Sequence, residues 1–133
     1  MTDLERAKEF FSKDRYATEA TGIVIEAVAP NYAKCSLLLE DRHRNAVGGV
    51  MGGVYYTLAD FVFAVSTNFD AVLPTVTTVG QISYLSAAKG KQLVAESRLL
   101  KDGRTTCFYE ITITDELGNP VAVVSMTGAH LSR

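Results

Sequence analysis

The sequence lacks tryptophan and has only two cysteines and three prolines among its 133 residues. Cys35 and Cys107 are far apart, and each lies inside an apolar run. This placement is typical of buried thiols in a reducing compartment and argues against a disulfide framework. No cluster of cysteine and histidine has the spacing of metal ligands, so the sequence predicts no metal site and no cofactor.

Long apolar runs and an excess of one charge are also missing. No segment approaches the roughly 20 apolar residues of a membrane span. The N-terminal residues 1–16 are charged throughout and have no apolar core or cleavage site of a signal peptide. The net charge of -2 gives no basic field for nucleic acid or for a membrane surface. We therefore expect a cytoplasmic protein that binds neither.

The remaining composition, 47% hydrophobic and 21% charged, fits one globular domain over residues 1–133. Apolar spacing predicts a short amphipathic helix over 3–13 and a long apolar helix over 54–69. The expected strands cover 22–29, 32–40, 75–86, 92–101, 105–115 and 120–131. The first two strands form a hairpin at Pro30-Asn31, and the last four form a meander. The predicted fold class is α+β, with one curved antiparallel sheet of about six strands wrapped around one long central helix.

The long helix is apolar on two faces. Side chains at helical spacing on one face are Val54, Leu58, Phe61, Val62, Val65 and Phe69. The opposite face carries Tyr56, Ala59, Asp60, Phe63 and Thr67. A helix of this kind must be covered on all sides, so we expect the sheet on one face and a second subunit on the other. The aromatic residues Tyr55, Tyr56, Phe61, Phe63 and Tyr84 fit either a substrate pocket or an ordinary core.

Asp60 is the charged residue that does not fit this helix. Between Arg44 and Lys89 the sequence has only two charges, Asp60 in mid-helix and Asp70 at the helix end. An unpaired buried carboxylate costs several kcal/mol, and desolvation raises its pKa, which favours a base or a nucleophile. The alternatives are a buried carboxylate satisfied by local donors and an aspartate at a wet dimer seam.

The segment GGVMGG at residues 48–53 precedes the helix. A helix N-terminus presents free N–H groups, and Gly52 and Gly53 allow a carbonyl group to approach them, as in an oxyanion hole. A flexible loop is the alternative. Gly52 and Asp60 are separated by about 12 Å along a helix, too far to act on one carbonyl carbon. If both act, they come from different subunits of a two-fold dimer.

These residues resemble a known signature. Asn45-x-x-Gly48-x-x-Met51-Gly52-Gly53, followed by Thr57-Leu58-Ala59-Asp60, is similar to the motif of hotdog-fold acyl-CoA thioesterases, and most closely to the phenylacetic-acid-degradation type. The resemblance implies a hotdog fold, hydrolysis of an acyl-CoA thioester to free acid and CoA, and a homodimer that pairs into a homotetramer, a dimer of dimers. It implies Asp60 as nucleophile or general base, Gly52 as oxyanion donor, Asn45 as the group orienting the carbonyl or water, and Thr78 as the holder of the water or the carboxylate.

Met51 departs from this motif, because the family usually has histidine there and methionine donates no hydrogen bond. We expect Met51 and Gly53 to contact substrate. Slower catalysis, a different acyl group and a non-catalytic acyl-CoA binding protein all stay open. A hotdog dehydratase is disfavoured, since no histidine lies between residues 44 and 129, and His43 and His130 are predicted to be structural or surface residues. Basic residues that could meet the CoA phosphates, or form a solvated rim, are Lys89, Lys91, Arg98, Lys101 and Arg104.

Overall fold

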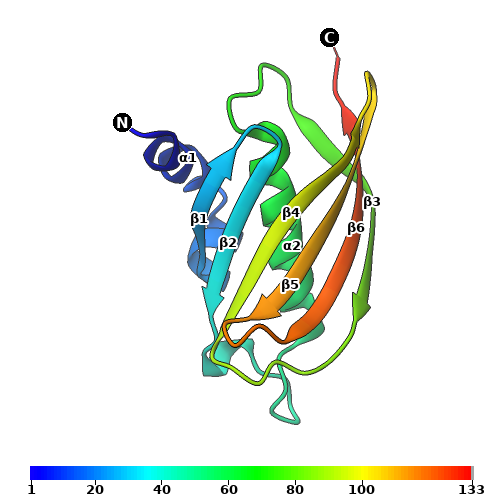
Figure 1. The fold of residues 1–133 in the computed structure, drawn as a ribbon. Coiled ribbons are helices and arrows are strands. Elements are labelled where there is room, and N and C mark those ends of the chain that lie inside the picture. The colour runs from blue at the N-terminus through cyan, green and yellow to red at the C-terminus, as the bar shows by residue number, and fades with distance from the viewer. Residues whose placement is uncertain (133) are drawn as a thin grey trace.

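One antiparallel six-stranded sheet curves around the long helix α2 (Gly52–Asn68) in the computed structural model, which describes residues 1–132 (Figure 1). The strands are β1 (Ile23–Ala29), β2 (Tyr32–Leu38), β3 (Thr75–Tyr84), β4 (Gln92–Asp102), β5 (Thr106–Asp115) and β6 (Pro120–His130). The predicted strands and the α+β hotdog architecture are confirmed, with ends that differ by a few residues.

The predicted four-strand meander is wrong for its first strand. The sheet order is β1-β2-β4-β5-β6-β3, so β4, β5 and β6 form a meander while β3 lies at the far edge beside β6. β4 instead pairs with β2, with Cys35 opposite Ala95. The connection from Tyr84 to Gln92 is too long for a tight hairpin and crosses the end of the sheet. Residue patterns identify strands, but they do not say which strand lies beside which.

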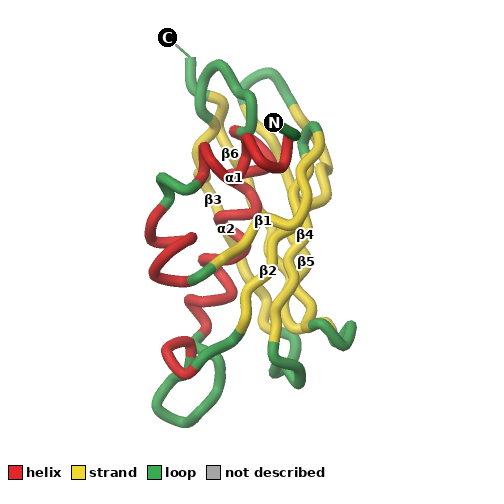
Figure 2. Tube along the Cα trace, turned by 90° about the vertical axis from the view of Figure 1, so that its left-hand side faces the viewer, coloured by secondary structure: helices red, strands yellow, loops and turns green. Residues whose placement is uncertain are grey.

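Three short helical elements complete the chain. Helix α1 (Asp3–Phe11) begins after Thr2, whose side chain accepts a hydrogen bond from the Glu5 N–H. The π-helix η1 (Tyr16–Thr21) was not predicted, and it ends at Gly22 with φ of 92°. The 3₁₀ turn η2 (Asp41–His43) follows β2. Figure 2 shows α1, η1 and α2 on the same side of the sheet.

The inner face of α2 packs into the concave face of the sheet. Ala59 and Phe63 are 0% and 1% exposed, and the Phe63 ring meets Tyr109 of β5 edge to face at 5.4 Å. Both predicted apolar faces of α2 therefore contribute side chains to the core. A curved sheet wraps around more of the helix than a single apolar stripe covers. Tyr55, Phe61 and Phe63 are all buried, so the core interpretation holds for these three aromatic residues.

The buried carboxylate of Asp115 fixes the end of the sheet nearest the start of α2. It accepts hydrogen bonds from the backbone N–H groups of Lys89, Gly90, Leu117 and Asn119 at 2.9–3.1 Å, and from the Asn119 side chain at 3.0 Å. Burial raises the pKa of this carboxyl, but the hydrogen bonds outweigh burial and hold the pKa well below its usual range. Asp115 thus ties the β3–β4 connection to the β5–β6 turn.

None of the helices within residues 1–132 is both long enough and apolar enough to cross a bilayer.

Candidate active site

The glycine segment forms the first turn of α2. Met51 is the N-cap residue, with extended backbone (φ -64°, ψ 132°), and the helix starts at Gly52, two residues earlier than predicted. The Met51 Sδ accepts a hydrogen bond from the Gly53 N–H at 3.1 Å. The Gly52 N–H donates no hydrogen bond within residues 1–132. A free backbone donor therefore stands at the positive end of a 17-residue helix.

Tyr84 of β3 holds this turn in place. Its Oη donates a hydrogen bond to the carbonyl oxygen of Gly52 at 2.9 Å, and its ring meets Tyr55 edge to face. A Cβ added at Gly52 would lie 2.9 Å from the Tyr84 Oη. A larger residue at this position would therefore force Tyr84 to move, which gives this glycine a packing role besides any approach of substrate. The sequence predicts Tyr84 only as an aromatic residue of a substrate pocket or of the core, and does not predict this contact.

Asp60 lies two turns further along, on the outward face of α2. Its side chain is exposed in the single chain, so the prediction of a carboxylate buried within the chain is wrong. The carboxylate borders a depression of about 310 Å³ whose lining includes Asp14, Tyr16, Ala17, Thr57 and Phe61. Partial desolvation raises the pKa of Asp60, a hydrogen bond from Thr77 opposes the rise, and the Asp14 charge adds to it. A carboxylate in this state is suited to accept a proton.

The hydroxyl group that contacts Asp60 comes from Thr77. Its Oγ1 donates to Asp60 Oδ1 at 3.2 Å, whereas the Thr78 Oγ1 donates to the Thr127 carbonyl oxygen. The prediction that Thr78 holds the carboxylate is therefore wrong within one subunit, where Thr77 makes this contact. A register shift of β3 against β6 lies between Thr77 and Val79. This bulge decides which threonine faces the helix, and two consecutive threonines in a sequence give no sign of it.

Asn45 organises the loop that leads to α2. Its Oδ1 accepts hydrogen bonds from the Val47 and Gly49 N–H groups, at 3.1 and 3.0 Å. Its own N–H donates to the Gly49 carbonyl oxygen at 2.7 Å. The amide oxygen of Asn45 is therefore committed to the loop, and the Nδ2 group is what its exposed side chain offers to a substrate.

Neither histidine replaces the one missing from the motif. His43 is buried, accepts a hydrogen bond from the Glu40 N–H through Nδ1 and donates one from Nε2 to the Thr21 carbonyl oxygen. His130 lies between Asp102 and Thr75, at 2.7 Å from each. Both imidazoles are thus fixed in structural hydrogen bonds, as the sequence predicted.

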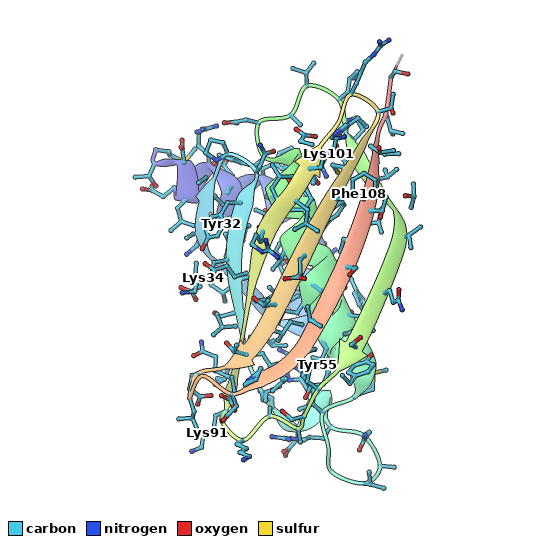
Figure 3. The ribbon with its side chains drawn as sticks, turned by 45° about the vertical axis from the view of Figure 1, so that its right-hand side comes forward. Tyr32, Lys34, Tyr55, Lys91, Lys101 and Phe108 are labelled. Carbon is cyan, nitrogen blue, oxygen red and sulfur yellow. The ribbon has the colours of Figure 1, made fainter. Side chains whose placement is uncertain are left out.

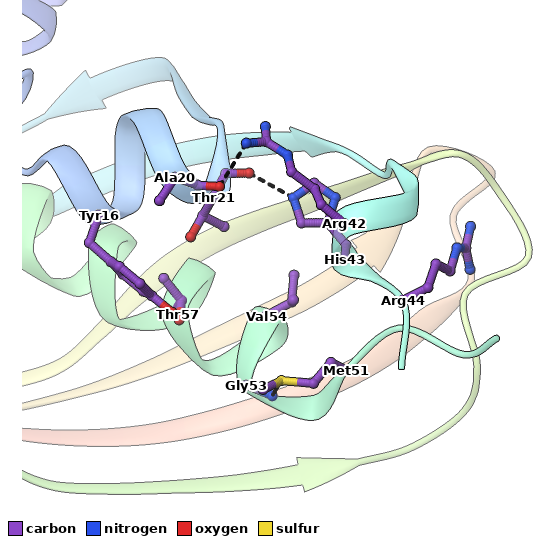
Figure 4. Close-up of a pocket in the computed structure, with 10 residues that line it drawn as sticks. All are labelled: Tyr16, Ala20, Thr21, Arg42, His43, Arg44, Met51, Gly53, Val54 and Thr57. Atoms are coloured by element: carbon purple, nitrogen blue, oxygen red, sulfur yellow. Dashed lines mark hydrogen bonds between the residues drawn. The ribbon is translucent and has the colours of Figure 1, made fainter. Parts of the chain in front are cut away.

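A second depression, of about 380 Å³, opens beside the first turn of α2 (Figure 4). Met51 and Gly53 lie on one side of it, and Tyr16 and Thr57 extend it toward the depression at Asp60, which Tyr16 and Thr57 also line. The Arg42 guanidinium is held by the Ala20 carbonyl oxygen at 2.7 Å and by Glu40. Tyr16 was not among the predicted site residues, since it reaches this position through η1.

The predicted basic residues do not form one patch in a single chain. Lys89 lies in the β3–β4 connection, near the start of β4, and Arg104 lies in the β4–β5 turn. The 11 residues of β4 separate them by roughly 35 Å. Lys91 and Lys101 likewise lie at opposite ends of the sheet (Figure 3). Within one subunit, the structure therefore contradicts a joint contact of these side chains with one nucleotide.

Among residues 1–132 no group of three or more His, Cys, Asp or Glu side chains is arranged to hold a metal ion.

Comparison with known proteins identifies the class of this site. Residues 47–122, more than half of the chain, match the family described as Thioesterase superfamily. The chain belongs to the thioesterase superfamily. The match includes the first turn of α2, Asp60 and both threonines at the bulge, and thioester hydrolysis is the activity of this class.

Individual relatives agree with this assignment. Human acyl-coenzyme A thioesterase 13 is 30% identical over 82% of this chain and 79% of its own length. The Escherichia coli PaaI protein from the phenylacetic acid degradation operon has the same fold, with a TM-score of 0.88, 21% identity and coverage of 98% of this chain and 94% of its own. A Streptococcus pneumoniae thioesterase structure with coenzyme A has a TM-score of 0.82, 22% identity and coverage of 92% and 98%.

Proposed function

We propose that this thioesterase hydrolyses an acyl-CoA to the free acid and CoA. The observation that carries the proposal is the Asp60 carboxylate, which has a raised pKa and a hydroxyl partner and borders an open depression. The names of the human relative and of the coenzyme A complex support CoA as the carrier of the acyl group. The expected setting is the cytoplasm.

The proposed site is shared by two subunits. Gly52 and Asp60 are about 12 Å apart along α2, so one subunit cannot bring both to a single carbonyl carbon. Two antiparallel α2 helices at a two-fold axis would bring Gly52 of one protomer to Asp60 of its partner. The outward face of α2 and the exposed apolar edge at Val76 and Val79 of β3 support an interface there. Pairing of such dimers into a tetramer is the further expectation.

In the proposed mechanism, the Gly52 N–H donates a hydrogen bond to the thioester carbonyl oxygen and stabilises the oxyanion. One such donor typically contributes about 2.7–4 kcal/mol in the transition state. The ionised Asp60 accepts a proton from the attacking water, or attacks the carbonyl carbon itself to form a mixed anhydride that water then cleaves. The CoA thiolate is the leaving group in both routes, and both need Asp60 ionised.

Other predicted residues have supporting positions in this proposal. Asn45 Nδ2 orients the carbonyl group or the water, Thr78 holds the water across the dimer, and Met51 and Gly53 line the approach. Lys89 and Arg104 would meet the CoA phosphates only if the two came from different protomers.

A panel of acyl-CoA thioesters tests the activity, with CoA thiol release as the readout. We expect release from at least one aryl or medium-chain acyl-CoA by the wild type and its loss in Asp60→Asn. Met51→His, which restores the motif, is expected to raise the rate. An Asp60→Asn variant as fast as the wild type on every cleaved substrate would overturn the catalytic assignment.

Mixing two inactive variants tests the shared site. Gly52→Pro removes the proposed donor at the first helical position, where proline is tolerated, and the extended backbone of Met51 suits a following proline. Combining it with Tyr84→Phe relieves the contact with the Tyr84 hydroxyl. After subunit exchange with Asp60→Asn, one site per heterodimer is intact, and about a quarter of wild-type activity should return. Activity that stays at the level of the separate variants would contradict a shared site.

The second candidate function is acyl-CoA binding without hydrolysis. The observation that favours it is the thioether of Met51 at a position where the motif has an imidazole. In that case acyl-CoA binds, as measured by calorimetry, no thiol is released, and Asp60→Asn leaves the affinity unchanged.

A further inference from the structure

Met51 is an exposed residue that accepts a hydrogen bond directly beside Gly52, the proposed oxyanion donor. Its side chain is 52% exposed and lines the depression beside the start of α2 (Figure 4). Its Sδ accepts the Gly53 N–H at 3.1 Å, next to the unpaired N–H of Gly52. N-cap side chains normally offer an oxygen to these N–H groups, and a thioether is a weak acceptor. The sulfur thus occupies the N-cap oxygen position, where a small oxidant can reach it.

We propose that Met51 is a reversible oxidation site through which a peroxide switches off the thioesterase. In this step the O–O bond of hydrogen peroxide breaks and one oxygen atom forms an S–O bond with Sδ. The thioether is oxidised by two electrons to the sulfoxide, and the peroxide is reduced to water. The inference rests on the proposed function of Gly52 as the oxyanion donor.

The sulfoxide changes the chemistry of the first turn. Its oxygen is polar and carries partial negative charge, and the positive end of the α2 dipole with its N–H groups stabilises such a group. From the position of the present sulfur, this oxygen reaches the Gly53 N–H and competes with substrate for the Gly52 N–H. The oxidised side chain therefore acts as an internal competitor of the thioester carbonyl oxygen.

The other sulfur atoms of the chain give matched internal controls. Met126 in β6 is 1% exposed, and Met1 at the N-terminus is 79% exposed but precedes α1, far from the start of α2 (Figure 1). Cys35 and Cys107 are both fully buried, and burial raises the pKa of Cys35 to about 12. Oxidation by peroxide is therefore expected at Met51 and Met1, with only the former affecting the site.

The test is peroxide treatment followed by peptide mass mapping and acyl-CoA hydrolysis. We expect one added oxygen at Met51 and none at Met126, with a fall in kcat/KM of roughly tenfold or more. Treatment with the two methionine sulfoxide reductases should restore the rate. Met51→Leu, measured against its own untreated rate, should keep most of its activity. The proposal would be overturned by full activity of protein oxidised at Met51. It would also be overturned by an equal loss of activity in peroxide-treated Met51→Leu, or by oxidation of Met1 without oxidation of Met51.

A second readout does not depend on hydrolysis. Amide proton–nitrogen NMR spectra of the wild type should show the Gly52 and Gly53 signals moving on oxidation and returning on reduction. If untreated protein cleaves no acyl-CoA, the proposed function fails while this measurement still tests the contact. Unmoved glycine signals in protein oxidised at Met51 would contradict the sulfoxide contact itself.

Discussion

The two faces of α2 differ in what they contact and in what they contribute. The inner face, with Leu58, Val62 and Phe63, is buried against the sheet. The outer face, with Thr57, Asp60 and Ala64, borders an open depression and carries the carboxylate with a raised pKa. Burial of each large apolar side chain stabilises the fold by about 1.5–3 kcal/mol, whereas partial desolvation of a carboxylate costs stability. The inner face of α2 therefore stabilises the fold, and its outer face carries the carboxylate proposed for catalysis.

The largest expected effect is on the outer face, in Asp60→Asn. Removing the proposed base or nucleophile should lower kcat/KM by about 10²–10⁴-fold, as measured by thiol release. Asp70→Asn is the matched control, since Asp70 pairs with Arg6 beyond the helix end and should leave the rate unchanged.

The thermal stability of Asp60→Asn should not fall with its activity. The pKa of Asp60 is raised on folding, so the native state binds its proton more tightly than the unfolded state. This carboxyl therefore lowers stability as pH rises from the unfolded pKa through the folded pKa. Asp60→Asn should unfold at the same or a higher temperature than the wild type at neutral pH. Marked destabilisation at neutral pH would show that Asp60 is a structural residue and that the outer face of α2 also stabilises the fold.

On the inner face of α2, Phe63→Ala should lower the stability of the protein. Loss of this buried ring removes its contacts with Tyr109 and leaves a cavity, at an expected cost of about 3–5 kcal/mol in the free energy of unfolding. Urea unfolding measures the change. Thr67→Ala, one turn further along the helix, removes a hydroxyl that donates to the Phe63 carbonyl oxygen and should cost only about 0.5 kcal/mol or less.

A smaller effect distinguishes the two threonines at the bulge. Thr77→Val removes the hydrogen bond that favours the ionised form of Asp60, so the pKa of this carboxyl should rise further. The acid limb of the profile of kcat/KM against pH should move to higher pH. Thr78→Val should leave the position of this limb unchanged, and a shift in Thr78→Val alone would assign the carboxylate contact to Thr78 of the partner subunit.

The smallest effect on activity is expected in Asp115→Ala, because this carboxylate bonds turn residues at the end of the sheet. The depressed pKa of Asp115 means that its stabilising effect is present above the unfolded pKa and is lost as pH falls through the folded pKa. The variant should melt below the wild type at neutral pH, and the two melting temperatures should converge in strong acid. Thermal unfolding as a function of pH measures this. A difference independent of pH would show that the carboxylate charge is not the stabilising feature.

Much of the fold was predictable from local patterns. Short apolar and β-branched runs between turn signals located all six strands, helical apolar spacing located α1, and the apolar run after the glycines located α2. The site was less predictable. Asp60 stands out in the sequence as a charge in mid-helix, but the prediction that it is buried within the chain is wrong, because the exposed face of a helix depends on how far the sheet wraps around it.

Local periodicity and side-chain type were enough to specify the main elements, the family motif and the residues available for chemistry. Tertiary structure decided the edge position of β3, the contact of Thr77 with Asp60 and the hydrogen bond between Met51 and Gly53. It also fixed His43 and His130 in structural hydrogen bonds. The physical reason is the same in each case: strand neighbours, bulges and hydrogen-bond partners are set by groups distant in the chain or by backbone geometry, neither of which residue spacing specifies.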